Sequence, residues 1–206
     1  MLVRAAQQAD GFYEITKEDI EQASKLEMRL LGVHQWENAA AAIRAAEYLL
    51  SDTGMQSEYI CEGVKEARWP GRMEILSREP FLMVDGAHNG HGVLALRDSL
   101  RFLYPEERFH FIMGVMADKD YENMVTELLP LAIDFVTVTP ESSRALQGEE
   151  LARVIEKKGI HAKNCISVQE ALRPWIEPKQ NASLVDKTIC FGSLYFIGEI
   201  EGLQIT

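Results

Sequence analysis

A short polar turn at residues 85–91 carries the side chains of this chain that are best suited to chemistry. It reads Asp-Gly-Ala-His-Asn-Gly-His and follows the wholly apolar run Phe81–Val84, which is typical of a strand buried on both faces. An ionised carboxylate such as Asp85 accepts hydrogen bonds from ribose hydroxyls or an ammonium group, or binds a metal ion. His88 can donate to a carboxylate or phosphate, stack on a base or bind a metal. Because ligands bind at the carboxyl ends of parallel strands, the turn predicts a ligand site.

Other interpretations of the same turn stay open. Asp85 could simply cap the helix that follows. Asp85, His88 and His91 are spaced as D-x-x-H-x-x-H, but no fourth ligand lies nearby in the sequence, so we predict no metal site. Glycines in such a turn indicate positive φ angles or a close approach of the backbone to another group, and a glycine turn leading into a helix can bind an anion. The glycines are Gly86, Gly90 and Gly92.

Candidate cations and a hydroxyl lie outside this turn. Arg72 follows Trp69-Pro70-Gly71, and a guanidinium at such a hinge can clamp a phosphate, although most arginines are surface residues. Lys119 is a similar candidate, and Ser193 precedes the last expected helix, where it could be only the N-cap. The chain contains no G-x-x-x-x-G-K-[ST] motif, so it brings no P-loop of its own. We expect the tryptophans to be packing residues: Trp36, Trp69 and Trp175.

Strands and helices must alternate to position these side chains, and residues 71–206 show that alternation. Strands are expected at 72–77, 81–84, 109–115, 135–139, near 166 and at 188–191. Helices are expected at 92–103, 121–131, 148–158, 169–175 and after residue 193. This order predicts an α/β fold, with a mostly parallel sheet, helices on both faces and an antiparallel pair at one edge. The loops at 85–91, 116–120, 140–146 and 192–193 should then meet at one edge of the sheet.

Residues 1–68 do not show this regular alternation of strands and helices, and they are expected to form a separate, small α+β segment. Apolar and charged residues alternate at 25–31, which predicts a half-buried strand. Helices are expected at 16–23 with Thr16 as the cap, at 38–50 with Gly54 as the stop, and at 58–67. The Trp-Pro-Gly break places the domain boundary between residues 68 and 69, so that 69–206 form the second domain.

Composition argues against several classes of partner and site. The 206 residues carry a net charge of −11 and are 47% hydrophobic, as in ordinary globular proteins. Nucleic acids and acidic membranes attract chains with excess Lys and Arg, so neither is expected as a partner. The three cysteines are far apart without a CxxC pair, which predicts neither a zinc site nor a disulfide framework and fits a reducing cytoplasm. We also expect no signal peptide and no membrane span.

Further short motifs accompany the Asp85 turn in a fixed order. They are Gly32-Val-His-Gln-Trp-Glu-Asn-Ala, Trp69-Pro-Gly-Arg-Met-Glu, Asp85-Gly-Ala-His-Asn, Gly114-Val-Met-Ala-Asp-Lys-Asp, Thr139-Pro with Arg144 following, and Gly192-Ser-Leu-Tyr. Together they resemble one family, the folylpolyglutamate synthases with their bifunctional dihydrofolate synthase relatives, within the Mur ligase superfamily. The resemblance covers residues 25–200 and implies a Rossmann-like C-terminal ligase domain, preceded by the last strand and helices of an ATP-binding domain.

The resemblance implies ATP-dependent amide ligation. Such enzymes phosphorylate a carboxylate of a folate, the amino group of L-glutamate attacks the acyl phosphate, and ADP and phosphate are released. By motif, Asn38 would contact the adenine side of ATP, Asp85 the ribose, and Arg72 the phosphates, where a cation stabilises the transferring charge. His88 and Ser193 would help to place the glutamate. Arg72 and His88 are thus the residues that the resemblance implies in catalysis.

This chain departs from the family pattern at two places. Gly90 stands where the family turn usually has proline, which loosens the unfolded turn without altering the chemistry. The N-terminal domain that would bring the P-loop, the Mg2+ ligands and most of the pterin pocket is missing, so we expect the chain alone to be catalytically incomplete. Residues 1–67 would keep apolar faces that normally pack on that domain, which predicts an exposed hydrophobic patch and self-association through it.

Three alternative functions stay open. The chain could be a non-catalytic nucleotide-binding module with the same fold. It could belong to another Mur-type amide ligase that acts on a cell-wall precursor, although His34-Gln35 and Trp69-Pro70-Gly71-Arg72 favour the folate branch. A metal-dependent hydrolase using Asp85, His88 and His91 would hold zinc.

Overall fold

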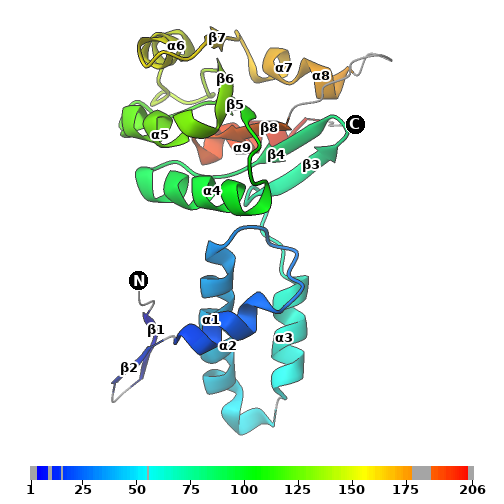
Figure 1. Ribbon diagram of the computed structural model, residues 1–206. Coiled ribbons are helices and arrows are strands. Elements are labelled where there is room, and N and C mark those ends of the chain that lie inside the picture. The colour runs from blue at the N-terminus through cyan, green and yellow to red at the C-terminus, as the bar shows by residue number, and fades with distance from the viewer. Residues whose placement is uncertain (1–3, 9–10, 15, 55, 178–186, 204–206) are drawn as a thin grey trace. The chain divides into compact units, whose positions relative to one another are not determined.

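The chain divides into two compact units, residues 1–70 and residues 71–206 (Figure 1). The computed structural model describes residues 4–8, 11–14, 16–54, 56–177 and 187–203. The division lies between Pro70 and Gly71, inside the Trp-Pro-Gly break. Among the described helices, none is both long and apolar enough to cross a membrane.

The first unit combines a short hairpin with helices. Its antiparallel strands are β1 (Arg4–Gln8) and β2 (Gly11–Glu14). Its helices are α1 (Lys17–Ser24), α2 (His34–Leu50), the 3-10 helix η1 (Ser51–Thr53) and α3 (Ser57–Glu66). Buried alanines form a small core between α1 and α2, namely Ala23, Ala39 and Ala40, and Val64 of α3 packs against them.

Most expected elements of this unit are present, with two corrections. Thr16 caps α1, and Gly54 adopts a φ of 73° after η1, as a stop signal requires. The strand expected at 25–31 is wrong: its side chains alternate between exposed and half-buried, but this part of the described chain pairs with no strand. Side-chain alternation reports which face is buried, whereas a strand also needs a hydrogen-bonded partner. Trp69 is not a packing residue, because 66% of it is exposed.

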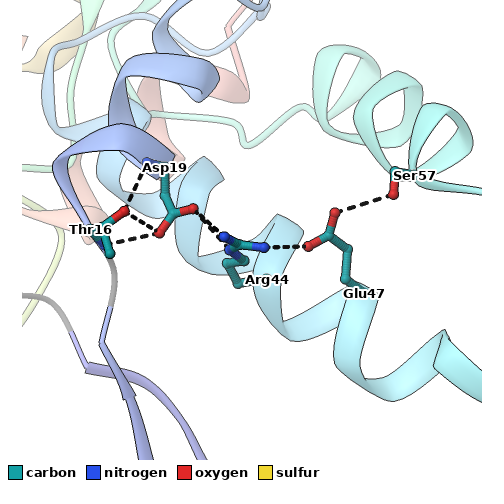
Figure 2. Close-up of polar contacts among 5 residues, drawn as sticks. All are labelled: Thr16, Asp19, Arg44, Glu47 and Ser57. Carbon is teal, nitrogen blue, oxygen red and sulfur yellow. Dashed lines mark hydrogen bonds and ion pairs between the residues drawn. The ribbon is translucent and has the colours of Figure 1, made fainter.

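A series of polar contacts links the α-helices α1, α2 and α3 of the first unit, as Figure 2 shows. The side chain of Thr16 accepts from the N–H of Asp19, and Asp19 Oδ2 accepts from the N–H of Thr16 at 2.9 Å. Asp19 Oδ1 also accepts from Arg44 Nε of α2 at 2.9 Å. Arg44 pairs in turn with Glu47 at 3.2 Å, and Glu47 accepts from the Ser57 hydroxyl of α3 at 3.3 Å. The capping of α1 is therefore tied to α2 and α3.

The second unit is built on a six-stranded sheet with the order β3-β4-β8-β5-β6-β7. The strands are β3 (Glu74–Arg78), β4 (Phe81–Val84), β5 (Phe109–Met113), β6 (Ala132–Thr137), β7 (Ala162–Asn164) and β8 (Lys187–Phe191). The pair β3–β4 is antiparallel and all other pairs are parallel. The predicted α/β fold with an antiparallel edge is therefore confirmed.

Helices cover the sheet on both faces. They are α4 (Gly90–Leu103), α5 (Tyr121–Leu128), the 3-10 helix η2 (Leu129–Leu131), α6 (Gly148–Lys157), α7 (Val168–Ala171), α8 (Arg173–Ile176) and α9 (Leu194–Glu201). In Figure 1, α4 and α5 lie on the side of the sheet away from α7 and α8. The weak strand expected near Ile166 is β7 at 162–164, and the helix expected at 169–175 is two short helices, with Pro174 in the first turn of α8.

Each face of the central strands packs against its own layer. One face places Val84, Ile112 and Cys190 against α9, α7 and α8, including Trp175, whose Nε1 donates to the Pro80 carbonyl at 3.0 Å. The packing role expected for Trp175 is confirmed. The opposite face carries aromatic rings, with Phe111 stacked on Phe135 at 5.3 Å between ring centroids. Burial on both faces explains why β4 is a continuous apolar run and why β5 and β8 are mostly apolar.

Candidate functional site

The loops at the carboxyl ends of the parallel strands meet at one edge of the sheet, as predicted. We call this edge the rim: residues 85–91, 116–120, 140–146 and 192–193. The N–H of Gly192 donates to the carbonyl of Ala87 at 2.9 Å, which joins the loop after β8 to the turn after β4. The N–H of Ala117 donates to the carbonyl of Arg144 at 2.8 Å, which joins the loops after β5 and β6.

Gly192 connects these two halves of the rim by close approach. Its φ is 120°, and a Cβ on Gly192 would lie 2.6 Å from the carbonyl oxygen of Gly114 at the end of β5. Both the backbone angle and the distance require glycine. The four loops therefore form one continuous surface.

Asp85 is held at the end of β4 by backbone donors, and only 5% of it is exposed. Its Oδ1 accepts from the N–H of Ala87 at 2.8 Å and its Oδ2 from the N–H of Met73 at 3.0 Å. The capping interpretation of Asp85 is wrong, because Asn89 caps α4 by accepting from the N–H of Gly92 at 2.8 Å. The side chain predicted to bind a ligand therefore also organises the chain around it.

Arg72 lies beside the Asp85 turn. The N–H of Gly86 donates to the carbonyl of Gly71 at 2.7 Å, which holds the segment before β3 against the turn after β4. A Cβ on Gly86 would lie 3.4 Å from Arg72 Nη1, so the guanidinium sits next to the glycine backbone. Burial raises the pKa of Asp85, while the two backbone donors and the charge of Arg72 oppose that rise. The structure thus brings Arg72 and Asp85 together.

The glycines of the turn serve close approach rather than positive φ. None of the three has a positive φ angle, so that interpretation of the sequence is wrong. A Cβ on Gly86 would meet Leu194 Cδ2 at 2.7 Å, and one on Gly92 would meet the Cα of Ala87 at 3.3 Å. A Cβ on Gly90 would contact only the Asn123 side chain, at 3.3 Å. Gly90 is therefore the least constrained of the three.

His88 is half-buried and its ring is oriented by the backbone. Its Nδ1 lies 2.8 Å from the carbonyl oxygen of Gly86. Because a carbonyl oxygen only accepts, Nδ1 carries the proton and Nε2 of the neutral ring is an acceptor. His91 is exposed, and no group of three metal-binding side chains occurs among the described residues. The arrangement gives His88 a defined acceptor atom and does not support a zinc hydrolase.

Ser193 and Asn38 have local structural partners. Ser193 is buried and caps α9 through its Oγ, which accepts from the N–H of Phe196 at 3.1 Å, so the N-cap interpretation is confirmed. A hydroxyl that accepts one hydrogen bond can still donate its own proton. Asn38 belongs to the first unit. It lies in α2, is exposed, and donates from Nδ2 to Gln35 Oε1 at 3.0 Å.

A second charged group on the rim centres on Asp118, which is not among the site residues expected from the sequence. Its two carboxylate oxygens accept from Arg144 Nη2 at 3.0 and 2.9 Å, and Lys119 Nζ lies 3.5 Å from Oδ2. The hydrogen bond from Arg144 lowers the pKa of Asp118. Lys119 thus lies next to a carboxylate that is already paired. The only signal in the sequence is the presence of both residues in motifs, because the contact forms when two separate loops meet.

Comparison with known proteins identifies a family model and relatives that match this chain. Residues 71–194 match the family model described as Mur ligase, glutamate ligase domain. A curated relative, the dihydrofolate synthase/folylpolyglutamate synthase of Bacillus subtilis, is 31% identical over 174 residues. That alignment covers 84% of this chain and 39% of the relative, so the chain spans about two fifths of that protein.

Solved structures share the fold. A folylpolyglutamate synthase from Mycobacterium tuberculosis, complexed with ADP and AMPPCP, has a TM-score of 0.74 at 20% identity, covering 100% of this chain and 46% of that one. A bifunctional folylpolyglutamate synthase/dihydrofolate synthase from Yersinia pestis, complexed with AMPPNP and a manganese ion, has a TM-score of 0.68 at 21% identity, covering 95% and 44%. These two likenesses show the shared fold, while the matched domain model and the B. subtilis relative show that the chain belongs to the folylpolyglutamate synthase and dihydrofolate synthase family of Mur ligases and carries their C-terminal glutamate ligase domain.

Proposed function

We propose that this chain is the C-terminal part of an ATP-dependent folylpolyglutamate synthase, which adds L-glutamate to folates through an acyl-phosphate intermediate. The observation that carries the proposal is the gathering of Arg72, Asp85 and His88 at the end of β4, inside a glutamate ligase domain. Because the chain spans 39% of its B. subtilis relative, the activity belongs to a longer enzyme. The first unit would be the end of the ATP-binding domain of that enzyme.

At the nucleotide end, Arg72 would contact the phosphates and Asp85 the ribose. Arginine stays charged at all relevant pH values and presents several donors to phosphate oxygens, so it suits the charge that moves during phosphoryl transfer. Each carboxylate oxygen of Asp85 uses one lone pair on a backbone N–H and keeps another for a ribose hydroxyl. Asn38 of the first unit would contact the adenine.

At the glutamate end, His88 and Ser193 would place the incoming amino acid. With Nδ1 donating to the carbonyl of Gly86, a neutral form of the His88 ring would offer Nε2 as an acceptor, which suits the amino group of glutamate. The Ser193 hydroxyl can donate to a carboxylate while it caps α9. In the reaction the amine nitrogen bonds to the acyl carbon, the bond from that carbon to the phosphate oxygen breaks, phosphate leaves, and the nitrogen loses its proton.

ATP and a divalent cation are the expected cofactors. The nucleotides and the manganese ion in the relatives from M. tuberculosis and Y. pestis support this choice. The described residues contain no group of three side chains that could hold a metal ion, and the sequence contains no P-loop. We therefore assign both features to the N-terminal domain of the enzyme. Free thiols at all three cysteines support a cytoplasmic location.

The first test asks whether the chain alone can ligate glutamate. Purified chain is incubated with ATP, Mg2+, labelled L-glutamate and a reduced folate, and we expect no labelled product, because nothing in the chain binds the triphosphate through a P-loop. The DNA immediately upstream of Met1 is read in parallel. An open frame encoding G-x-x-x-x-G-K-[ST] is the expected result, and the protein from that whole frame should ligate glutamate.

The outcomes separate the competing functions. Robust ligation by the chain, free of any full-length enzyme, would refute the claim that it is incomplete. If no P-loop is encoded upstream and nucleotide still binds, the chain is a non-catalytic module. In an active whole protein, Arg72→Ala should lower kcat by about a hundredfold to a thousandfold, as loss of one charge-stabilising donor does, whereas Arg101→Ala on the exposed side of α4 should not.

A further inference from the structure

Hydrogen bonds hold the segment just before β3, residues 71–73, against the turn after β4, and each of the two segments donates one of them. Gly86 donates to the carbonyl of Gly71 at 2.7 Å, and Met73 donates to Asp85 Oδ2 at 3.0 Å. Glu74 Oε2 accepts from the N–H of Gly71 at 2.8 Å. Arg72 lies in the middle of this segment, between Gly71 and Met73.

The backbone of this segment is in an unusual conformation. Gly71 has a φ of 67°, and Met73, which carries a full side chain, has a φ of 45°. A residue with a Cβ is disfavoured in this left-handed region and persists there only when its surroundings hold it. The Met73 side chain is buried, and its N–H is the group that Asp85 binds. Asp85 is therefore positioned to stabilise the disfavoured conformation.

We propose that Asp85 is a positioning residue for Arg72: by holding the Met73 N–H, its carboxylate fixes the Gly71–Met73 turn and thereby directs the Arg72 guanidinium over Gly86. The close spacing of Arg72 Nη1 to Gly86, at 3.4 Å from a Cβ built there, marks where the guanidinium is directed. Contact of that guanidinium with nucleotide phosphates rests on the proposed function. The positioning of Arg72 by Asp85 is independent of that function.

The burial of Asp85 favours this role over ribose binding alone. Both of its oxygens already accept a backbone N–H, and 5% of the residue is exposed. A carboxylate used only for a ribose would not need to hold the main chain on two sides. The positioning role predicts that losing the carboxylate affects Arg72 before any ligand is present.

The first experiment uses the ligand-free chain and the nearly isosteric change Asp85→Asn, which leaves one acceptor oxygen for two N–H donors. We expect amide hydrogen exchange at Met73 to accelerate about tenfold or more, and the Arg72 Nε–Hε resonance to shift and lose order in NMR relaxation. The matched control is Asp98→Asn on the exposed face of α4, which should change neither signal. Unchanged Met73 and Arg72 signals in Asp85→Asn would overturn the proposal.

A measurement on the unsubstituted chain covers the case in which Asp85→Asn does not fold. There the Met73 amide should be protected although it precedes β3, and the Arg72 Nε–Hε group should be ordered. Rapid exchange at Met73, or a disordered Arg72 side chain, contradicts the proposal without any variant.

The second experiment compares ADP with adenosine, which has the ribose but no phosphates. If Asp85 acts through Arg72 as well as on the ribose, Asp85→Asn weakens ADP binding about tenfold more than adenosine binding, and this additional loss disappears in an Arg72→Ala background. Equal weakening of both ligands would mean that Asp85 binds the ribose directly and would overturn the positioning role. If the unsubstituted chain binds neither ligand, the nucleotide part of the proposed function fails, while the ligand-free NMR result still decides whether Asp85 positions Arg72.

Discussion

At the scale of single residues, Gly192 is a position that tolerates little change. A Cβ there would meet the main-chain oxygen of Gly114 at 2.6 Å, and φ is 120°. We expect Gly192→Ala to lower the free energy of unfolding of the second unit by about 2–4 kcal/mol, because backbone strain and a clash with main-chain atoms add. Thermal unfolding, followed by hydrogen exchange of the β5 and β8 amides, measures this effect.

Gly198 provides the matched control. It lies in the interior of α9, and a Cβ on it would meet nothing within 4 Å. Gly198→Ala should stabilise the same unit by about 0.5–1 kcal/mol, since alanine is the better helix former. A comparable loss of stability in both variants would show that the Gly114 contact is not the cause.

The sequence identifies the rim residues by type but not by partner. A carboxylate and an imidazole after a buried apolar run are readable along the chain, so Asp85 and His88 could be predicted. The hydrogen bond between Asp85 and Met73 depends on how β3 pairs with β4, and that register is set by packing rather than by either residue alone. The same holds for Asp118 and Arg144, which meet only when two loops come together.

At the scale of elements, the start of α1 depends on a capping box. Hydrogen bonds from Thr16 lower the pKa of Asp19 below its ordinary value of 3.8, and the charge of Arg44 adds to this. A lowered pKa means that the ionised form stabilises the folded state, so the contribution is present above the unfolded pKa and is lost as pH falls through the folded pKa. Asp19→Asn should therefore cost about 1 kcal/mol at neutral pH and progressively less below pH 3.8.

Urea unfolding of the two proteins across this pH range provides the measurement. Glu21→Gln on the same helix is the control, because Glu21 is exposed and its ion pair with Lys25, at 3.1 Å, lies at the surface. That change should cost less than about 0.5 kcal/mol at any pH. A cost for Asp19→Asn that does not decrease on acidification would contradict the assigned role of the ionised carboxylate.

Long amphipathic elements could be predicted, while short or solvent-facing ones could not. Helices α4 and α6 have wide apolar faces and are found within two residues of their expected limits. The position predicted for strand β7, near Ile166, is too far along the chain. Only Ala162 of its three residues is buried, so its sequence shows no alternation of apolar and polar residues. The segment at 25–31 shows the reverse error, since it alternates clearly but has no strand beside it among the described residues.

At the scale of the whole molecule, the first unit exposes large apolar side chains. They are Tyr48, Leu49 and Tyr59 on α2 and α3, and Trp69 after α3. This exposure supports the expected hydrophobic patch, and we predict that the chain self-associates through it. Sedimentation velocity over a range of concentrations should show association that Leu49→Lys weakens, because 75% of Leu49 is exposed and burying a charge in an interface is costly.

Ile166→Lys is the control for that prediction. Ile166 is still more exposed, at 89%, but lies in the second unit. It should leave the association unchanged. A strictly monomeric chain at high concentration, or equal effects of both substitutions, would argue against an interface on the first unit.

Strand order is the part of the architecture that sequence alone cannot supply. The last strand, β8, lies between β4 and β5, so neighbours in the sheet are far apart in the chain. Alternation predicts a parallel sheet but gives the same pattern for several orders of its strands. The family motifs therefore predict the residues of the rim better than the alternation of strands and helices does.

The antiparallel pair β3–β4 has a practical consequence for protein engineering. It folds one continuous stretch back on itself, so that Arg72, Asp85 and His88, which belong to the same short stretch of sequence, become neighbours. A single synthetic oligonucleotide can therefore encode this whole group, and combinatorial libraries can vary all three codons together. Compensating combinations, which separate mutations would miss, can then be selected from one pool.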